Sequence, residues 1–140
     1  AFWNAPERQS DHLVRALYGA CRIQEDLELI RSKIHQMDPI VQEAKIAFGI
    51  GICCGPITVG NFGSSFRFNY TVLGDAVNTA SRLESLTKEK GAPILVAANE
   101  LVDGQHIEFA NRVMLVSLVG STEIRGKQEV LNIFTAKFIQ

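Results

Sequence analysis

An asparagine and an arginine stand four residues apart in the segment YTVLGDAVNTASRLE, residues 70–84. A four-residue step places Asn78 and Arg82 on the same face of a helix. A guanidinium is a planar fork that donates two hydrogen bonds to a phosphoryl group and never loses its charge. One interpretation is therefore a phosphate-binding helix face. The other is a solvated face on which Arg82 pairs with Glu84 or Glu89, and spacing alone favours this second interpretation.

The flanking sequence predicts how this helix face is held. Residues 66–73 alternate between a large apolar face and a mostly polar face, which is typical of a strand. Thr71 lies on the polar face, close to the Gly74-Asp75 turn. Asp75 is a suitable N-cap for a helix over residues 76–89, and Gly91 is a suitable terminator.

A second strand, predicted over residues 45–54, has one bulky face and one nearly bare face. The bulky face carries Phe48 and three isoleucines, whereas Gly49 and Gly51 lie on the other face. Glycine inside a strand marks a bulge or the close approach of another backbone or a ligand. A ligand and a tightly packed helix are equally good explanations of the bare face.

The remaining pattern predicts an α+β domain. Apolar residues at three- and four-residue steps predict a long helix over residues 10–38, started by Ser10 or Asp11 and ended by Asp38-Pro39. An order of helix, three strands, helix, strand, short helix and strands favours a mostly antiparallel sheet. The other predicted elements are strands over 57–62 and 93–97, a short helix over 98–104, and strands within 107–118 and 121–138, interrupted by Gly120 and Gly126.

Composition excludes several classes of function. The chain has 140 residues, the size of one domain, and its net charge of −1 gives no reason to expect a nucleic-acid partner. Three cysteines, Cys21, Cys53 and Cys54, are an odd set without metal-ligand spacing, which predicts free thiols in a reducing compartment. No apolar run approaches the ~20 residues that cross a bilayer, and no signal peptide is expected.

The run GIGICCGPITVGNFGSSFRFNYTVLGDAVNTASRLE, residues 49–84, strongly resembles the central segment of class III nucleotide cyclases, the adenylate and guanylate cyclase catalytic domains. The likeness continues in AFWNAP at the start and in IRGKQEVLNIF, residues 124–134. It implies a ferredoxin-like cyclase domain with a mostly antiparallel sheet. Residues 1–140 are then expected to be a single partial domain that lacks the family's N-terminal strand and helices.

The resemblance also implies a reaction and roles for individual residues. The ribose 3′-hydroxyl of a nucleoside triphosphate attacks its own α-phosphorus, and pyrophosphate leaves. Asn78 matches the residue that orients the ribose, and Arg82 matches the one that stabilises charge on the α-phosphoryl group. Thr71 matches the purine-reading position, and Arg125 matches a lysine that binds the terminal phosphates. Asp75 belongs to the motif and is assigned only to capping.

The substrate implied is ATP, because a threonine hydroxyl can accept a hydrogen bond from the adenine amino group. That hydroxyl can also donate, so Thr71 leaves a guanylate cyclase open. The principal expectation is an adenylate cyclase that makes cyclic AMP in intracellular signal transduction. A catalytically inactive module that binds a nucleotide or a partner and only regulates is the alternative from another class.

In the family, Mg²⁺ or Mn²⁺ is bound by two aspartates that would precede residue 1. The other aspartates of this chain, Asp11, Asp26, Asp38 and Asp103, stand at positions that do not match them. The resemblance therefore implies that the chain holds the transition-state half of the site without the metal half. We expect residues 1–140 alone to be inactive.

The resemblance further implies a homodimer with active sites at the interface between head-to-tail subunits. An upstream sensor domain and a cytoplasmic location, in a parent protein that could be membrane-anchored, are the corresponding expectations. A sheet edge and an apolar face left open by the shortened domain predict self-association of the chain.

Overall fold

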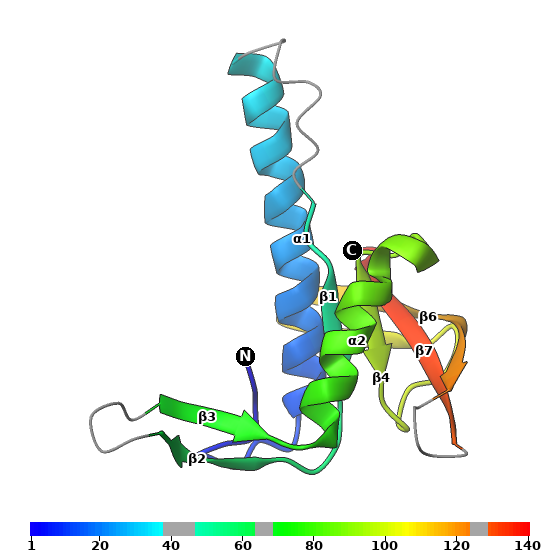
Figure 1. The fold of residues 1–140 in the computed structure, drawn as a ribbon. Coiled ribbons are helices and arrows are strands. Elements are labelled where there is room, and N and C mark those ends of the chain that lie inside the picture. Colours follow the sequence, from blue (N-terminus) through cyan, green and yellow to red (C-terminus); the bar gives the residue numbers. More distant parts are fainter. Residues whose placement is uncertain (38–46, 64–68, 124–128) are drawn as a thin grey trace.

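A computed structural model describes residues 1–37, 47–63, 69–123 and 129–140. The predicted long helix and the helix after Gly74 are both confirmed, with bounds within two residues of those expected. The elements shown in Figure 1 are α1 (His12–Met37), β1 (Ile50–Cys53), β2 (Thr58–Phe62), β3 (Asn69–Leu73), α2 (Asp75–Lys90), β4 (Ile94–Ala97), β5 (His106–Phe109), β6 (Arg112–Glu123) and β7 (Val130–Phe138).

Five strands form the main sheet in the order β1-β4-β7-β6-β5. Strands β1 and β4 are parallel, and the other three pairings are antiparallel. The predicted α+β class with a mostly antiparallel sheet is therefore confirmed. The register between β6 and β7 shifts between Leu118 and Gly120, so β6 continues through a bulge where the sequence predicted an interruption at Gly120.

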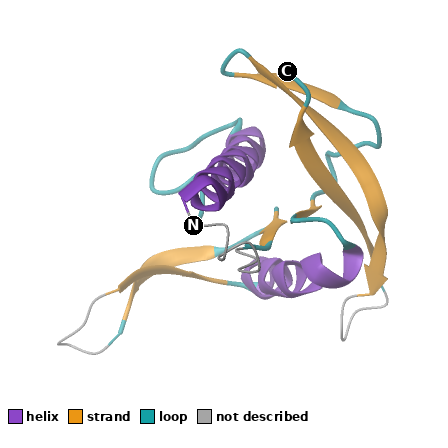
Figure 2. Ribbon diagram, turned by 90° about the horizontal axis from the view of Figure 1, so that it is seen from above, coloured by secondary structure: helices purple, strands orange, loops and turns teal. Residues whose placement is uncertain are grey.

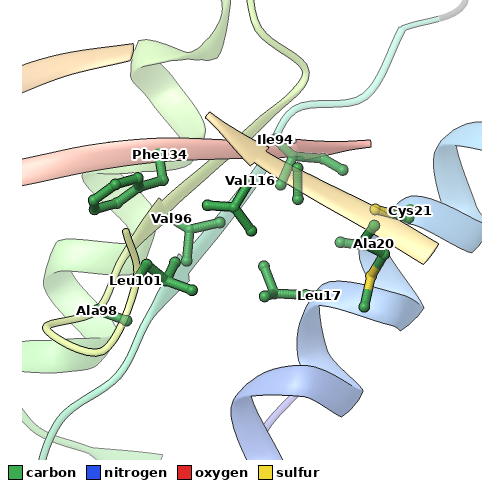
Figure 3. Packing of buried hydrophobic residues seen from close by; sticks show 11 residues of the cluster. Leu17, Ala20, Cys21, Ile94, Val96, Ala98, Leu101, Val116 and Phe134 are labelled. Atoms are coloured by element: carbon green, nitrogen blue, oxygen red, sulfur yellow. The ribbon is translucent and has the colours of Figure 1, made fainter. Parts of the chain in front are cut away.

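The two helices cover opposite faces of the sheet, as the view in Figure 2 shows. Strand β4 is buried on both sides, and its residues alternate between two apolar clusters. Ile94 and Val96 pack with Leu17 and Ala20 of α1 in the larger cluster, which Figure 3 shows. Leu95 and Ala97 pack instead with Leu83 of α2, together with Ile133 of β7. The sheet therefore holds both helices in fixed positions.

The face of β1 that carries the glycines has almost no side chains because α2 packs directly against it. A Cβ added at Gly51 would overlap the carbonyl oxygen of Ala80 and the backbone nitrogen of Glu84. A Cβ added at Gly49 would overlap the side-chain oxygen of Thr87. Of the two explanations that the sequence left open, the packed helix is thus confirmed. On the opposite face of β1, Ile50 and Ile52 pack against the larger cluster, which includes Leu17 of α1.

Two further local predictions were wrong. Gly74, not Asp75, occupies the N-cap position of α2, and no side chain forms a capping hydrogen bond there. Asp75 is instead the first helical residue, where its negative charge interacts favourably with the positive end of the helix dipole. Residues 98–104 form turns rather than a short helix. Two isolated bonds of the turn type connect Ala98 with Leu101 and Val102 with Gln105, and no helical ladder follows them. Predicted strand positions at 45–46 and 66–68, and Gly126, lie outside the described residues.

An ion pair connects α1 with β6 of the main sheet. Arg112 on β6 donates from both terminal nitrogens to the carboxylate of Glu25 on α1, at 2.8 and 3.2 Å. Its Nε donates to the backbone oxygen of Gln140 at 2.8 Å. The guanidinium carbon also lies 3.8 Å from the ring centroid of Phe138. A single side chain therefore joins α1, β6 and the C-terminal end of β7.

This contact predicts a dependence of stability on pH. The hydrogen bond from Arg112 lowers the pKa of Glu25 from its ordinary value of 4.5. A carboxyl with a lowered folded-state pKa adds stability above its ordinary pKa, and that stability is lost as the pH falls through the lowered value. We expect Arg112→Gln to reduce the free energy of unfolding at neutral pH and to flatten its decline below about pH 4.5. Urea unfolding at a series of pH values measures the free energy of unfolding at neutral pH and its decline in acid.

The matched control is Arg15→Gln. It breaks the 2.8 Å pair between Arg15 and Asp11 inside α1 and leaves the bridge between Glu25 and Arg112 intact. In this variant the free energy of unfolding should still fall with decreasing pH by the amount that Glu25 contributes in the wild type. An Arg112→Gln protein whose stability falls with acid as steeply as that of the wild type would contradict the assignment.

Candidate active site

Helix α2 presents Asn78 and Arg82 to the surface. Its inner face is formed by Ala76, Leu83 and Thr87, which are buried against the sheet. Asn78 and Arg82 are both exposed, one helical turn apart. The ion pairs formed among residues 1–37, 47–63, 69–123 and 129–140 do not include Arg82, so the predicted pairing with Glu84 or Glu89 is not found there. The guanidinium remains available to a ligand.

Glycines fix both ends of this helix. Gly74 has φ 151°, a left-handed conformation that disfavours side chains, and a Cβ there would lie 3.0 Å from the carbonyl oxygen of Pro56. At the other end Gly91 has φ 64°, and its N–H donates to the carbonyl of Lys88 while the N–H of Ala92 donates to that of Thr87. The predicted C-terminal glycine stop is confirmed, and it satisfies carbonyls that the helix leaves unpaired.

Thr71 lies on strand β3, whereas Asn78 and Arg82 lie on helix α2. It is half-buried in β3, where it pairs across the hairpin with Gly60 of β2. The two-stranded sheet β2–β3 extends away from the main sheet, as Figure 1 shows. Only the short Gly74 turn separates Thr71 from α2 along the chain. The strand-to-helix turn therefore sets the position of Thr71 relative to the helix. Arg125 lies outside the described residues.

The structure adds residues that the sequence analysis missed. An open hollow of about 40 Å³ lies beside Arg82, between α2 and the ends of β6 and β7. Glu123, the last residue of β6, is exposed and brings a carboxylate to this hollow. Sequence periodicity gave no signal for it, because the hollow depends on how β6 and β7 pass α2. The lining residues are Thr79, Arg82, Leu83, Leu86, Thr122, Glu123 and Leu131.

The described residues do not fit a metal site. No three of their His, Cys, Asp or Glu side chains are grouped closely enough to hold an ion. Asp11 pairs with Arg15, and Asp26 lies 3.9 Å from Arg22. Asp103 accepts a 2.7 Å hydrogen bond from the backbone N–H of Leu118. We therefore assign no metal ligand among them.

The cysteines are free thiols, as predicted. Cys21 is buried in the larger apolar cluster, and burial raises its pKa to about 11. Burial also raises the pKa of Cys53 and Cys54. A raised pKa keeps a thiol protonated and unreactive at neutral pH, so these side chains act as small apolar groups.

Neither helix of the described segments combines the length and the apolar composition needed to span a bilayer.

Comparison with known proteins identifies relatives that match most of this chain. Adenylate cyclase of Anabaena cylindrica is 31% identical over 122 residues, which cover 87% of this chain and 24% of that protein. Adenylate cyclase 1 of Rhizobium meliloti strain 1021 is 31% identical over 134 residues, covering 96% of this chain and 19% of that protein. The chain thus spans about a quarter of one relative and a fifth of the other.

A solved structure supports the fold independently. The crystal structure of a guanylyl cyclase superposes on 96% of this chain and 62% of its own with a TM-score of 0.65, at 23% sequence identity. The family profile described as the adenylate and guanylate cyclase catalytic domain matches residues 8–136. This match confirms the resemblance carried by residues 49–84, and the chain belongs to the adenylate and guanylate cyclase catalytic domain family.

Proposed function

We propose that this domain is an adenylate cyclase, which converts ATP to cyclic AMP and pyrophosphate in intracellular signal transduction. The observation that carries the proposal is the outer face of α2. There Asn78 and Arg82 stand exposed one turn apart on a helix whose opposite face is locked against β1. A rigid element is suited to hold a sugar and a phosphate together when it presents an amide and a guanidinium that forms no ion pair within the part of the chain that the structure describes.

Arg82 has the larger role in this proposal. As the 3′-hydroxyl attacks the α-phosphorus, negative charge grows on the phosphoryl oxygens. A guanidinium placed beside them stabilises that charge, which is the main contribution a protein makes to phosphoryl transfer. Asn78, about 6 Å away along the helix axis, orients the ribose so that its hydroxyl points at the phosphorus.

Thr71 and Arg125 complete the proposed substrate contacts. The Thr71 hydroxyl accepts a hydrogen bond from the adenine amino group, and Arg125 binds the terminal phosphates. The two relatives at 31% identity are both named adenylate cyclases, which supports ATP over GTP. A guanylate cyclase is the alternative, because a hydroxyl can also donate to a guanine carbonyl.

The domain is proposed to work as a homodimer, with the outer face of α2 turned toward the complementary half of the site on the other subunit. Mg²⁺ or Mn²⁺ would be held by carboxylates outside the described residues, since these do not fit a metal site. The two relatives at 31% identity are several times longer than this chain. We further propose a parent protein with an upstream sensor, in which this catalytic module is cytoplasmic, with or without a membrane anchor.

Reconstitution tests the proposal. The 140-residue chain is mixed with the catalytic domain of the Anabaena cylindrica relative, in which the residue that aligns with Arg82 has been replaced by alanine. That domain supplies the other half of a mixed site. We expect cyclic AMP from MnATP to appear only with both proteins present, and little cyclic GMP from MnGTP. The chain alone is expected to give no product.

Each contrary result points to a different function. Cyclic GMP in place of cyclic AMP would identify a guanylate cyclase. No product from a mixed dimer, verified by analytical ultracentrifugation, would favour a regulatory module in which Asn78 and Arg82 only bind. Turnover by the chain alone would show that it carries a complete site.

A further inference from the structure

The C-terminal half of α1 extends beyond the sheet against which its first half packs, as Figure 1 shows. Three large apolar side chains on this half follow one another at steps of seven residues: Ile23, Ile30 and Met37. Their exposed fractions are 53%, 49% and 85%. Because seven residues are close to two helical turns, the three side chains form one row along the helix. Single exposed apolar side chains are common, but a continuous row is typical of a contact with another protein surface.

The row continues a face of α1 that is covered nearer to the start of the helix. The side chain of Trp3 lies close to Gly19, four residues before Ile23, since a Cβ added at Gly19 would lie 3.8 Å from its ring. On the adjoining side of the helix, Leu17 and Ala20 are buried in the larger apolar cluster. From Ile23 onward the row is exposed. It is therefore the uncovered continuation of a packed face.

Two opposite charges lie along one side of this row. Asp26 and Lys33 are exposed, and each stands three residues after an isoleucine of the row. One carboxylate oxygen of Asp26 lies 3.9 Å from Arg22 on the same helix, a long contact between exposed groups. Within the described part of the chain, Lys33 takes part in no ion pair. The face therefore offers an acid and a base, seven residues apart, to a surface that carries both.

A second copy of α1 in antiparallel orientation meets the row and the charges together. With a two-fold axis at Ile30, this side chain meets the partner's Ile30, and Ile23 lies at the same height as the partner's Met37. Asp26 and the partner's Lys33 then differ in height by one residue, about 1.5 Å. They lie on the same side of the pair, because a two-fold axis brings equal flanks together. In a parallel pair the same two groups would be about 10 Å apart along the axis.

We propose that residues 23–37 of α1 form a self-association surface, through which two copies of this chain associate as an antiparallel helix pair. Helices α1 and α2 cover opposite faces of the sheet, as Figure 2 shows, so the proposal does not rest on the catalytic role of α2. The overlap is about 21 Å long, and so small a contact gives a weak and reversible association. Added salt weakens it further, because Asp26 and Lys33 face solvent.

The first test measures self-association of the whole chain by sedimentation equilibrium. Ile30→Glu places two carboxylates at the two-fold axis, and we expect it to raise the dissociation constant about tenfold or more. Leu29→Glu is the matched control, since Leu29 is 58% exposed on the same helix but lies about 100° around it. It should leave the constant within about twofold. Where a head-to-tail dimer also forms, the α1 contact appears as the step to a tetramer, and the same variants apply to that step.

Exchange of the two charges tests the register. Lys33→Glu sets two carboxylates against each other on both sides of the axis, and we expect a three- to tenfold weaker association at low salt, or about that. Adding Asp26→Lys to the same chain restores the opposite charges and should recover most of the loss. Circular dichroism checks that each variant keeps its helix content. A double variant that associates no better than Lys33→Glu alone would overturn the antiparallel register.

Cross-linking tests the orientation directly. With copper phenanthroline as oxidant, Ile30→Cys should give a disulfide-linked dimer, because residue 30 meets its own copy across the axis. Ile23→Cys should give little, since it faces the partner's Met37. Equal cross-linking of the two variants would indicate parallel helices and overturn the proposal, as would an Ile30→Glu chain that associates like the wild type. A wild-type chain that stays monomeric at every concentration also overturns it. Cyclase assays play no part in these readouts, so the proposed function and this contact fail separately.

Discussion

Replacing Gly51 by alanine is expected to destabilise the fold by about 3 kcal/mol or more, although it adds a single methyl group. The added carbon would overlap backbone atoms of Ala80 and Glu84 on α2, and backbone cannot rotate away as a side chain can. Helix α2 would have to move off β1, which loosens the cluster of Leu83 and Leu95 beneath it. Urea unfolding followed by circular dichroism measures the loss.

Gly60→Ala is the matched control, because Gly60 is also a strand glycine. A Cβ there would meet only the ring of Phe62, at 3.6 and 3.7 Å, which is ordinary contact. This variant should change the free energy of unfolding by less than about 1 kcal/mol. Equal losses in the two variants would show that the effect comes from strand glycine in general and not from the closeness of α2 and β1.

The same glycine shows how far the fold could be predicted. Alternation of bulky and bare residues in β1 identified the strand and its two faces. This pattern could not distinguish a helix from a ligand as the neighbour of Gly51, because close approach by either one requires a residue without a side chain. The error at Asp75 has a similar origin. Aspartate is a good N-cap by type, but the tight turn after β3 requires a left-handed residue at the cap position, and Gly74 takes it.

The candidate site was predictable where it is contiguous in the chain. Asn78 and Arg82 are linked by helical geometry alone, and their exposure agrees with either a solvated or a ligand-binding face. The resemblance over residues 49–84, and not periodicity, favoured the second interpretation. Glu123 could not be found in this way, because its closeness to Arg82 arises from the crossing of β6 and β7 past α2.

Removing the guanidinium of Arg82 should have the largest effect on catalysis. In the reconstituted assay, Arg82→Ala in this chain is expected to lower kcat for cyclic AMP formation by about 100- to 1000-fold, the usual loss when one group that stabilises transition-state charge is removed. KM should change much less, because charge on the phosphoryl oxygens grows only as the reaction proceeds. Unfolding should be almost unaffected, since Arg82 is exposed and has no ion pair among the described residues.

Two further variants decide whether position or charge matters. Arg82→Lys keeps the charge and loses the planar fork, so an intermediate rate is expected. Lys88→Ala removes a cation from the same helix, six residues further along, and should leave kcat within a fewfold of wild type. If Lys88→Ala were as damaging as Arg82→Ala, the helix would contribute only general positive charge. A kcat unchanged in Arg82→Ala would remove Arg82 from the transition state and leave the outer face of α2 as a binding surface alone.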